Sequence, residues 1–210
     1  MSVQTILKSE EEARGYVEAL ADRSDFERLE RYVEMLLAEN QKQNLISRPS
    51  EANLWLRHIA DSAQLLECIS EPAELAGPWL DLGTGPGLPG LVIAILRPQI
   101  PVVLVESRKR RVDFLDECVR KLALENCRVE AKRLEQVSPF HAGIISARAF
   151  APLDKLLRLS APFSTSATRY VLPKGRSAAH ELEVAKPSIR KMFHVKHSLT
   201  DADAGIIVSK

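Results

Sequence analysis

The chain has 210 residues, of which 45% are hydrophobic and 27% are charged, a composition typical of a soluble globular protein with a full α/β core. No apolar run is long enough to span a membrane and Met1–Ser9 has no signal-peptide core, so the sequence predicts a cytoplasmic protein without a membrane partner. The 3 cysteines form no Cys-x-x-Cys pair, and no His/Cys/Asp cluster has ligand spacing, so we expect reduced core thiols and no bound metal.

The first third of the chain is predicted to be helical. Ser9-x-x-Glu12 and Ser24-x-x-Glu27 are capping boxes, and each precedes an amphipathic run. In the second run the apolar residues that share one helical face are Phe26, Leu29, Val33, Leu36 and Leu37. A third helix is predicted to follow Pro49 with Ser50 as its cap and to continue to Ile69, and Pro72 and Gly77-Pro78 close the section. We expect a helical N-terminal extension over residues 1–76, packed on a catalytic domain over residues 77–210.

A glycine-rich loop follows the first predicted strand, Trp79–Leu82. It contains Gly83, Gly85, Gly87 and Gly90, and the next helix is predicted over Leu91–Leu96. Glycines at a strand-to-helix junction let the backbone come within contact distance of a bound nucleoside, where a side chain would collide. The loop therefore predicts a nucleotide-like cofactor, in preference to an incidental glycine-rich turn.

Two cofactors compete for this loop. Residues 85–90 satisfy Gly-x-Gly-x-x-Gly, the dinucleotide fingerprint, which is a weak signal on its own. The wider pattern Asp81-x-Gly83-x-Gly85-x-Gly87 places a carboxylate at the end of the strand, inside the concavity of the loop. A carboxylate there repels the pyrophosphate of NAD and attracts the cationic amino-acid end of S-adenosylmethionine, directly or through water. Asp81 therefore favours the methyl donor.

The next predicted strand, Val102–Val105, ends in an acidic residue. Glu106 follows Gly85 by about 20 residues, the separation expected of the acid that binds ribose hydroxyls. A carboxylate with two oxygens suits a vicinal diol. Because both candidate cofactors carry a ribose, Glu106 supports a nucleoside without choosing between them, and it argues against a 2′-phosphorylated cofactor.

The rest of the chain alternates between predicted strands and helices. The helices are predicted over Arg110–Leu124, over Leu153–Leu159 and shortly after Ser177. The strands are predicted near Arg128–Ala131, Gly143–Ala147 and Tyr170–Leu172, with a terminal hairpin of Phe193–His197 and Ile206–Val208. Alternating units imply a mainly parallel sheet with helices on both faces, to which the hairpin adds an antiparallel edge.

Cationic side chains follow three of these strands. Ligands of a doubly wound sheet bind at the carboxyl ends of the strands, where this chain places Lys132, Arg133, Arg148, Lys174 and Arg176. Residues 1–40 hold 5 Lys/Arg and 10 Asp/Glu, whereas the remaining residues hold 24 and 18, so the basic excess belongs to the same part of the chain. A single arginine is often structural. Three converging loops favour contacts with phosphate, with a base or with a cofactor carboxylate.

Several motifs occur in a specific order along the chain. They are Asn44-Leu45, Arg57-His58-Ile59-x-Asp61-Ser62, the run from Asp81 to Gly90, Lys109-Arg110, Arg133-x-Glu135, Ser146-Ala147-Arg148-Ala149 and Lys174-Gly175. In this order they resemble the bacterial small-subunit ribosomal RNA guanine-N7 methyltransferases, also called glucose-inhibited division protein B. The resemblance implies a Rossmann-like class I S-adenosylmethionine-dependent methyltransferase fold with a seven-stranded sheet. It also implies a monomer that methylates N7 of guanine 527 in 16S rRNA, within a small-subunit particle.

The resemblance also assigns residues. It implies cofactor contacts for Gly83, Leu88, Leu134, Glu135 and Arg148, which join the Asp81, Gly85, Gly87 and Glu106 of the loop argument. On the substrate side it implies catalytic roles for Arg133 and Arg148, to which the loop after the fifth predicted strand adds Lys174. The chain departs from the family at Glu39, where many members have Trp, and at Ala204 or Gly205, where many have Arg. These departures concern peripheral packing or RNA contacts and leave the cofactor site intact.

The loop after the fourth predicted strand indicates which atom accepts the methyl group. Methylation of an exocyclic amine commonly uses an Asn/Asp-Pro-Pro-aromatic loop here, whereas this loop reads Ser146-Ala147-Arg148. Methylation of a pyrimidine carbon needs a covalent nucleophile, usually Cys, which these loops lack. Guanine N7 has a free lone pair and no proton to lose, so it needs only placement. Arginine donors suit the O6/N7 edge, although a donor on N7 itself would block the attack.

The motif around His58 allows a structural and a functional interpretation. Helical spacing lets Arg57 pair with Asp61 and His58 pair with Ser62. The resemblance instead favours a role in shaping the cofactor or RNA pocket, without making His58 a base.

Two other functions are open. A nicotinamide-dependent oxidoreductase is disfavoured by Asp81 and by the lack of a Tyr-x-x-x-Lys set. A non-catalytic ribosome-binding or assembly protein is disfavoured by the intact cofactor loop.

Overall fold

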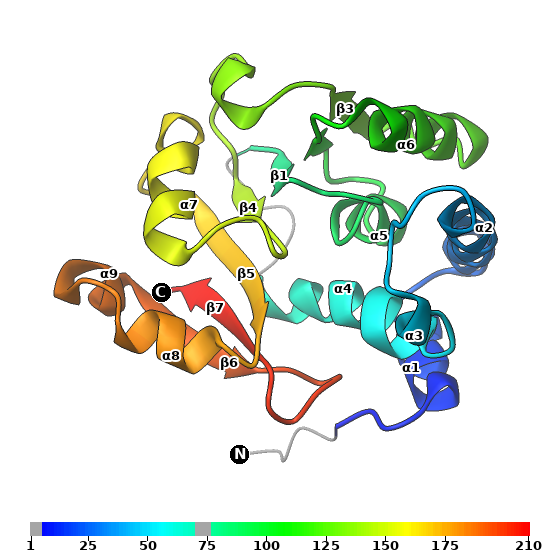
Figure 1. The fold of residues 1–210 in the computed structure, drawn as a ribbon, viewed down its shortest axis with the longest axis horizontal. Coiled ribbons are helices and arrows are strands. Elements are labelled where there is room, and N and C mark those ends of the chain that lie inside the picture. Colours follow the sequence, from blue (N-terminus) through cyan, green and yellow to red (C-terminus); the bar gives the residue numbers. More distant parts are fainter. Residues whose placement is uncertain (1–5, 70–76) are drawn as a thin grey trace.

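A seven-stranded sheet in the order β3-β2-β1-β4-β5-β7-β6 organises the computed structural model, which describes residues 6–69 and 77–210 (Figure 1). Its strands are β1 Trp79–Leu82, β2 Val102–Val105, β3 Cys127–Glu130, β4 Ile144–Ser146, β5 Arg169–Gly175, β6 Phe193–His197 and β7 Gly205–Ser209. Strands β1 to β5 pair in parallel, and β7 runs antiparallel between β5 and β6. The predicted parallel sheet with an antiparallel edge is confirmed. The strand order reverses between β1 and β4, and ligands of such sheets bind at the carboxyl ends of the strands at this point.

Helices cover both faces of the sheet. One face carries α5 (Gly90–Leu96) and α6 (Lys109–Lys121) together with the N-terminal helices, and the other carries α7 (Leu153–Ser160), α8 (Ala178–Glu183) and α9 (Pro187–Met192). Val102 and Leu104 point into the first core and Val103 and Val105 into the second, the period of two of a strand buried on both faces. Short 3₁₀ turns, η4 (Leu134–Gln136) and η5 (Ala161–Phe163), follow β3 and α7. Within the described ranges, no helix has the length and apolarity needed to cross a membrane.

The N-terminal section begins with two helices, α1 (Glu10–Glu18) and α2 (Arg23–Asn40). Ser9 caps α1 as predicted, since its hydroxyl accepts the backbone N–H of Glu12 at 3.1 Å. The predicted cap Ser24 of the second helix is wrong. Asp22 takes that position because its carboxylate accepts the backbone N–H of Asp25 at 2.8 Å.

The predicted third helix is a series of short segments with different hydrogen bonding. It consists of α3 (Arg48–Glu51), the π-helical η1 (Trp55–Ala60), α4 (Asp61–Ala63) and the 3₁₀ segment η2 (Gln64–Cys68). Its cap position is Ser47, so the prediction of Ser50 is wrong. The predicted closing residue Pro72 and the predicted boundary at residue 76 lie outside the described residues. Segments of π-helix are frequent at functional sites, and η1 carries His58.

The N-terminal section and the sheet share one hydrophobic core. Leu29 of α2 and Ile59 of η1 are fully buried in the same cluster as Ile93 of α5. The buried hydroxyl of Tyr32 donates to the carbonyl of Pro86 in the glycine-rich loop at 3.0 Å. Helix α2 therefore supports the loop that sequence reasoning assigned to the cofactor.

Candidate cofactor and substrate site

The loop between β1 and α5 has a backbone that only glycine adopts readily. Gly83, Gly85 and Gly87 have φ values of 63°, 60° and 102°. A Cβ at Gly83 would lie 2.6 Å from Cδ2 of Phe150, so that glycine also permits a close approach. At Gly85 the nearest atom to such a Cβ is a guanidinium nitrogen of Arg111 at 3.7 Å, an ordinary van der Waals contact. Gly85 and Gly87 are buried and Gly83 is partly exposed, so the left-handed turns shape the loop while Gly83 presents its backbone at the surface.

Asp81 supports this loop from within the fold. It is fully buried, and its two oxygens accept the backbone N–H of Gly90 at 3.0 Å and the hydroxyl of Ser146 at 2.7 Å. The Ser146 oxygen in turn accepts the indole N–H of Trp79 at 2.8 Å. Burial raises the pKa of Asp81, and the hydrogen bonds from Ser146 and Gly90 act in the opposite direction. The structure thus gives Asp81 a role in joining β1, β4 and α5, whereas the sequence predicted a contact with the amino group of a cofactor.

A cavity of about 300 Å³ opens beside the loop at the carboxyl ends of the first strands. We call it the loop cavity, and its lining includes Gly83, Glu106, Arg133, Leu134 and Glu135. These predicted site residues come from three separate loops, after β1, β2 and β3. The volume lies at the lower end of small-molecule sites, which span about 300 to 1,000 Å³.

Glu106 divides its two oxygens between the backbone and the cavity side. Oε1 accepts the backbone N–H groups of Ser107 and Arg108 at 2.7 and 2.9 Å, which fixes the turn after β2. Oε2 lies 3.5 Å from Nη1 of Arg111, a longer ion pair. The carboxylate is held in one orientation with an acceptor to spare, which suits a ribose diol.

A larger cavity of about 1100 Å³ lies between the loops after β4 and β5, the β6–β7 loop and the N-terminal section. We call it the arginine cavity, and its lining includes Arg57, His58, Asp61, Arg148 and Arg176. Predicted residues from distant parts of the chain therefore meet here. Arg148 lies in this cavity, apart from the predicted cofactor residues of the loop cavity, and Gly85, Gly87 and Leu88 line neither cavity.

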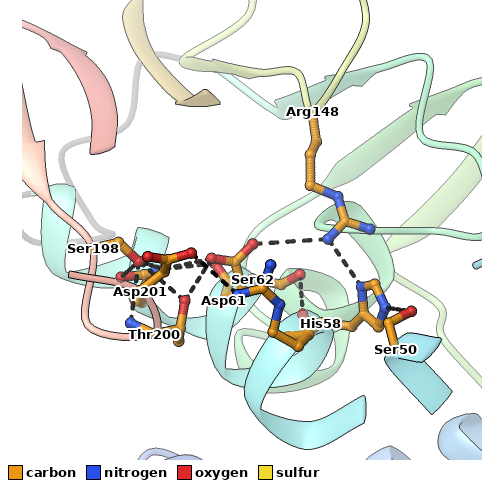
Figure 2. A network of polar contacts seen from close by, with 10 residues as sticks. Ser50, His58, Asp61, Ser62, Arg148, Ser198, Thr200 and Asp201 are labelled. Atoms are coloured by element: carbon orange, nitrogen blue, oxygen red, sulfur yellow. Dashed lines mark hydrogen bonds and ion pairs between the residues drawn. The ribbon is translucent and has the colours of Figure 1, made fainter. Parts of the chain in front are cut away.

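Figure 2 shows the guanidinium of Arg148 reaching from its loop toward the helical segment that carries His58 and Asp61. Its Nη1 lies 3.2 Å from Nδ1 of His58 and 3.8 Å from Oδ2 of Asp61. Oδ1 of Asp61 accepts hydrogen bonds from Nε2 of Gln64 at 2.8 Å and from the hydroxyl of Thr200 at 2.9 Å. The Asp61 carboxylate, which forms the longer ion pair with the guanidinium, is therefore held in place by hydrogen bonds of its own.

The pairs predicted from helical spacing are wrong. Nη1 of Arg57 binds Oδ2 of Asp201 at 3.2 Å, across the cavity wall, and leaves Asp61 to other partners. The hydroxyl of Ser62 donates to the backbone carbonyl of His58 at 2.6 Å and does not contact the imidazole. The spacing did bring His58 and Asp61 to one side of the segment, where both face Arg148.

The pKa values of His58 and Asp61 are shifted in opposite directions, and burial is the main cause of both shifts. Burial, followed by the nearby charges of Arg148 and Arg57, lowers the pKa of His58 to about 3, so the imidazole is neutral at neutral pH. Burial raises the pKa of Asp61, and the positive charge of Arg148 acts in the opposite direction. His58 thus presents a lone pair and no charge to the guanidinium.

Lys174 forms part of the wall of the arginine cavity. Its side chain is 8% exposed, and its Nζ donates to the carbonyl of Ala151 at 2.7 Å and to Oε1 of Glu181 at 3.0 Å. The same Glu181 oxygen accepts the backbone N–H of Leu153. These contacts tie the loop after β4 to α8. They give Lys174 a structural role at the cavity wall, and its substrate-side role stays a prediction.

Sequence reasoning did not single out Phe150. With its neighbour Ala151 it lines both cavities, and its ring packs against Gly83. The preceding Ala149 has a φ of 52°, a strained conformation for a residue with a Cβ that is common near functional sites. The sequence signal that could have identified this residue is that Phe150 is an aromatic residue in the loop that follows the fourth strand.

The two departures from the family pattern lie at different places. Glu39, near the end of α2, accepts hydrogen bonds from Lys42 and Gln43, each at 2.9 Å. Ala204 and Gly205 line the arginine cavity, and the carbonyl of Ala204 accepts the backbone N–H of Ser198 at 3.0 Å. Glu39 is therefore engaged in local packing, whereas the second departure faces the arginine cavity.

Solved structures define the class to which this fold belongs. A chain from the crystal structure of a fibrillarin/Nop5p complex aligns with a TM-score of 0.56 and 14% identity, covering 73% of this chain and 81% of its own. A mutant of MtNAS in complex with S-adenosylmethionine aligns with a TM-score of 0.55 and 14% identity, covering 96% and 77%. The fold is that of the Rossmann-like class I S-adenosylmethionine-dependent methyltransferases.

Sequence relatives narrow this class to one family. A family model described as rRNA small subunit methyltransferase G matches residues 25–205. A protein named Ribosomal RNA small subunit methyltransferase G from Erythrobacter litoralis (strain HTCC2594) is 52% identical over 205 residues, 98% of each chain. Its namesake from Sphingopyxis alaskensis (strain DSM 13593 / LMG 18877 / RB2256) is 51% identical over 210 residues, 99% of this chain and 89% of its own. This chain belongs to the rRNA small subunit methyltransferase G family.

Proposed function

We propose that this protein transfers a methyl group from S-adenosyl-L-methionine to N7 of a guanine in 16S rRNA, guanine 527 by family resemblance. The observation that carries the proposal is the pair of cavities on either side of Phe150. One offers Gly83 and Glu106 to a nucleoside, and the other offers Arg148 to a base. The partner is 16S rRNA within a small-subunit particle, and the protein acts as a monomer.

The loop cavity fits S-adenosylmethionine. Gly83 supplies a wall without a Cβ, Glu106 supplies acceptors for the ribose hydroxyls, and the buried Leu134 supplies an apolar contact for the adenine. When bound, this cofactor supplies an electrophilic methyl group. The buried turn of Gly85, Gly87 and Leu88 shapes the loop that carries Gly83, and Asp81 holds the loop to α5 through the backbone N–H of Gly90.

The arginine cavity fits a guanine. Nη1 of Arg148 is bound to His58, while no described residue accepts a hydrogen bond from its Nε or Nη2. These donors suit the O6 of a guanine, which leaves N7 free to attack. Because N7 loses no proton, the protein contributes placement and needs no base. Arg133, exposed at the rim of the loop cavity, is suited to an RNA phosphate.

Nucleoside mass spectrometry of 16S rRNA tests this function. RNA from cells without the protein should lack one 7-methylguanosine, and the wild-type gene should restore it. An unchanged content of 7-methylguanosine, or loss of a different modified nucleoside, would show that the assigned target atom is wrong. Calorimetry with S-adenosylmethionine and with NAD separates this function from the oxidoreductase alternative.

Removing the carboxylate of Glu106 should weaken cofactor binding. We expect Glu106→Ala to lower the affinity for S-adenosylmethionine by about 1 to 3 kcal/mol, the scale of lost charge-assisted hydrogen bonds. Glu106→Gln keeps an acceptor for Ser107 and Arg108, so it isolates the contribution of the second oxygen. Calorimetry measures both variants against Glu130→Ala, which removes a carboxylate at the end of the neighbouring β3. Wild-type affinity in both Glu106 variants would place the ribose elsewhere.

The rate of methyl transfer should be nearly independent of pH. Guanine N7 needs no deprotonation, and the lowered pKa of His58, about 3, keeps the imidazole neutral throughout the neutral range. Single-turnover methylation from about pH 6.5 to 8.5 should therefore be flat, with a solvent deuterium isotope effect close to one. A log-linear rise with pH together with a large isotope effect would indicate proton removal, and hence an amine or hydroxyl target.

A further inference from the structure

The contact with Arg148 assigns the tautomer of His58. A guanidinium nitrogen can only donate, so Nδ1 of His58, which lies 3.2 Å from Nη1 of Arg148, carries the lone pair. In the neutral imidazole Nε2 then carries the proton, and it donates to the hydroxyl oxygen of Ser50 at 2.9 Å. The Ser50 hydroxyl in turn donates to the carbonyl of Ser47 at 2.7 Å.

An ion pair with Asp61 supports the same guanidinium nitrogen. Oδ2 of Asp61 lies 3.8 Å from Nη1 of Arg148, while its Oδ1 is held by Gln64 and Thr200. Figure 2 shows the dashed lines from Arg148 to His58 and to Asp61, both on the helical segment opposite the loop of Arg148. Because both contacts use Nη1, they restrain the arginine without consuming its other donors. A guanidinium has five N–H groups in a fixed plane, so anchoring one nitrogen orients the rest.

We infer that His58 is a positioning residue, which holds the guanidinium of Arg148 in the arginine cavity by accepting a hydrogen bond at Nδ1. The inference builds on the proposed function, in which Arg148 places the guanine. It gives the N-terminal section a direct part in the site, because Ser47, Ser50, His58 and Asp61 all precede the sheet in sequence. A protonated imidazole would offer no lone pair to Arg148 and would repel it.

A matched pair of substitutions at His58 separates positioning from packing. Asn places its amide where Nδ1 lies and offers an oxygen to Arg148. Gln reaches the place of Nε2, near Ser50, and leaves Arg148 without that acceptor. We expect kcat for 16S rRNA methylation to fall at least tenfold in His58→Gln, with KM for RNA within threefold of wild type. His58→Asn should recover most of the rate, and equal losses in both variants would overturn the inference.

A double-mutant cycle identifies the residue through which His58 acts. In an Arg148→Met background, His58→Gln should cause no further loss of kcat, whereas independent, multiplying losses would contradict the inference. Urea unfolding of the same four proteins measures the contact without any activity. We expect the two substitutions to be coupled about fivefold in the folded-to-unfolded ratio.

Methylation kinetics and urea unfolding together distinguish a failure of this inference from a failure of the proposed function. Methylation by the wild type with no coupling in unfolding would reject the contact and the positioning role. Coupling in unfolding, with no methylation of 16S rRNA by the wild type, would reject the proposed function.

Discussion

Arg148→Ala is expected to lower the single-turnover rate of methyl transfer to 16S rRNA by at least about 100-fold. The guanidinium is held at Nη1 by His58 and Asp61, and its remaining donors have no protein partner among the described residues. Its removal takes away the group that places the base while the cofactor site stays intact. Because Arg148 is only partly buried and lies in a loop, the fold should survive, which circular dichroism checks.

The controls for this variant test geometry and charge separately. Arg148→Lys keeps the positive charge but replaces a planar group by a point charge, which cannot bind His58 and a base in one plane, so a large loss is also expected. Arg23→Ala removes an arginine that is 94% exposed on α2 and pairs with Glu27, and it should leave the rate unchanged. A rate for Arg148→Ala within threefold of wild type would show that the arginine cavity is not the site of methyl transfer.

Gly85→Val is expected to raise the Kd for S-adenosylmethionine by at least about 100-fold, because it combines backbone strain with crowding of Arg111, the ion-pair partner of Glu106. Gly85 has a φ of 60°, a conformation that costs a residue with a Cβ roughly 1 to 2 kcal/mol and a β-branched residue more. A Cβ built there already lies 3.7 Å from Nη1 of Arg111, so the added methyl groups of valine would displace the guanidinium beside the loop cavity. Calorimetry measures the affinity.

Gly175→Val is the matched control for that experiment. Gly175 has a φ of 61°, and nothing lies within 4 Å of a Cβ built on it, so valine brings similar strain without approaching the loop cavity. Its affinity for S-adenosylmethionine should match wild type. Tight binding of the cofactor by Gly85→Val, or binding of NAD in place of S-adenosylmethionine by the wild type, would contradict the assignment of this loop.

The sheet and the cofactor loop were predictable because local patterns specify them. The apolar run Val102–Val105 forms a strand with the predicted bounds, and Glu106 follows it into the loop cavity as the fingerprint spacing requires. Helix starts were less certain because Asp22 and Ser24 are both good caps, two residues apart, and tertiary packing decides between them. Apolar periodicity also does not distinguish α-, π- and 3₁₀-helix, so the changes of hydrogen bonding along residues 55–68 went unpredicted.

The arginine cavity could not be predicted from the sequence, because its contacts join residues that are far apart in the chain. His58 and Arg148 are 90 residues apart, and Arg57 and Asp201 are 144 residues apart. A single sequence displays only neighbours on one helical face, which is why Arg57 was paired with Asp61. The site role of Lys174 was predicted from its position after a strand. Its hydrogen bond to Glu181 depends on how α8 packs, which the sequence pattern does not show.

Phe150 and Ala151 form one partition with a cavity on either side. Lys174 fixes this partition to α8 through the carbonyl of Ala151. A ligand that displaces this partition from one side would change the free energy of binding on the other side, and thermodynamic reciprocity would make the effect equal in both directions. In the proposed function, where the methyl donor and the RNA occupy the two cavities, such a displacement would link cofactor binding to RNA binding.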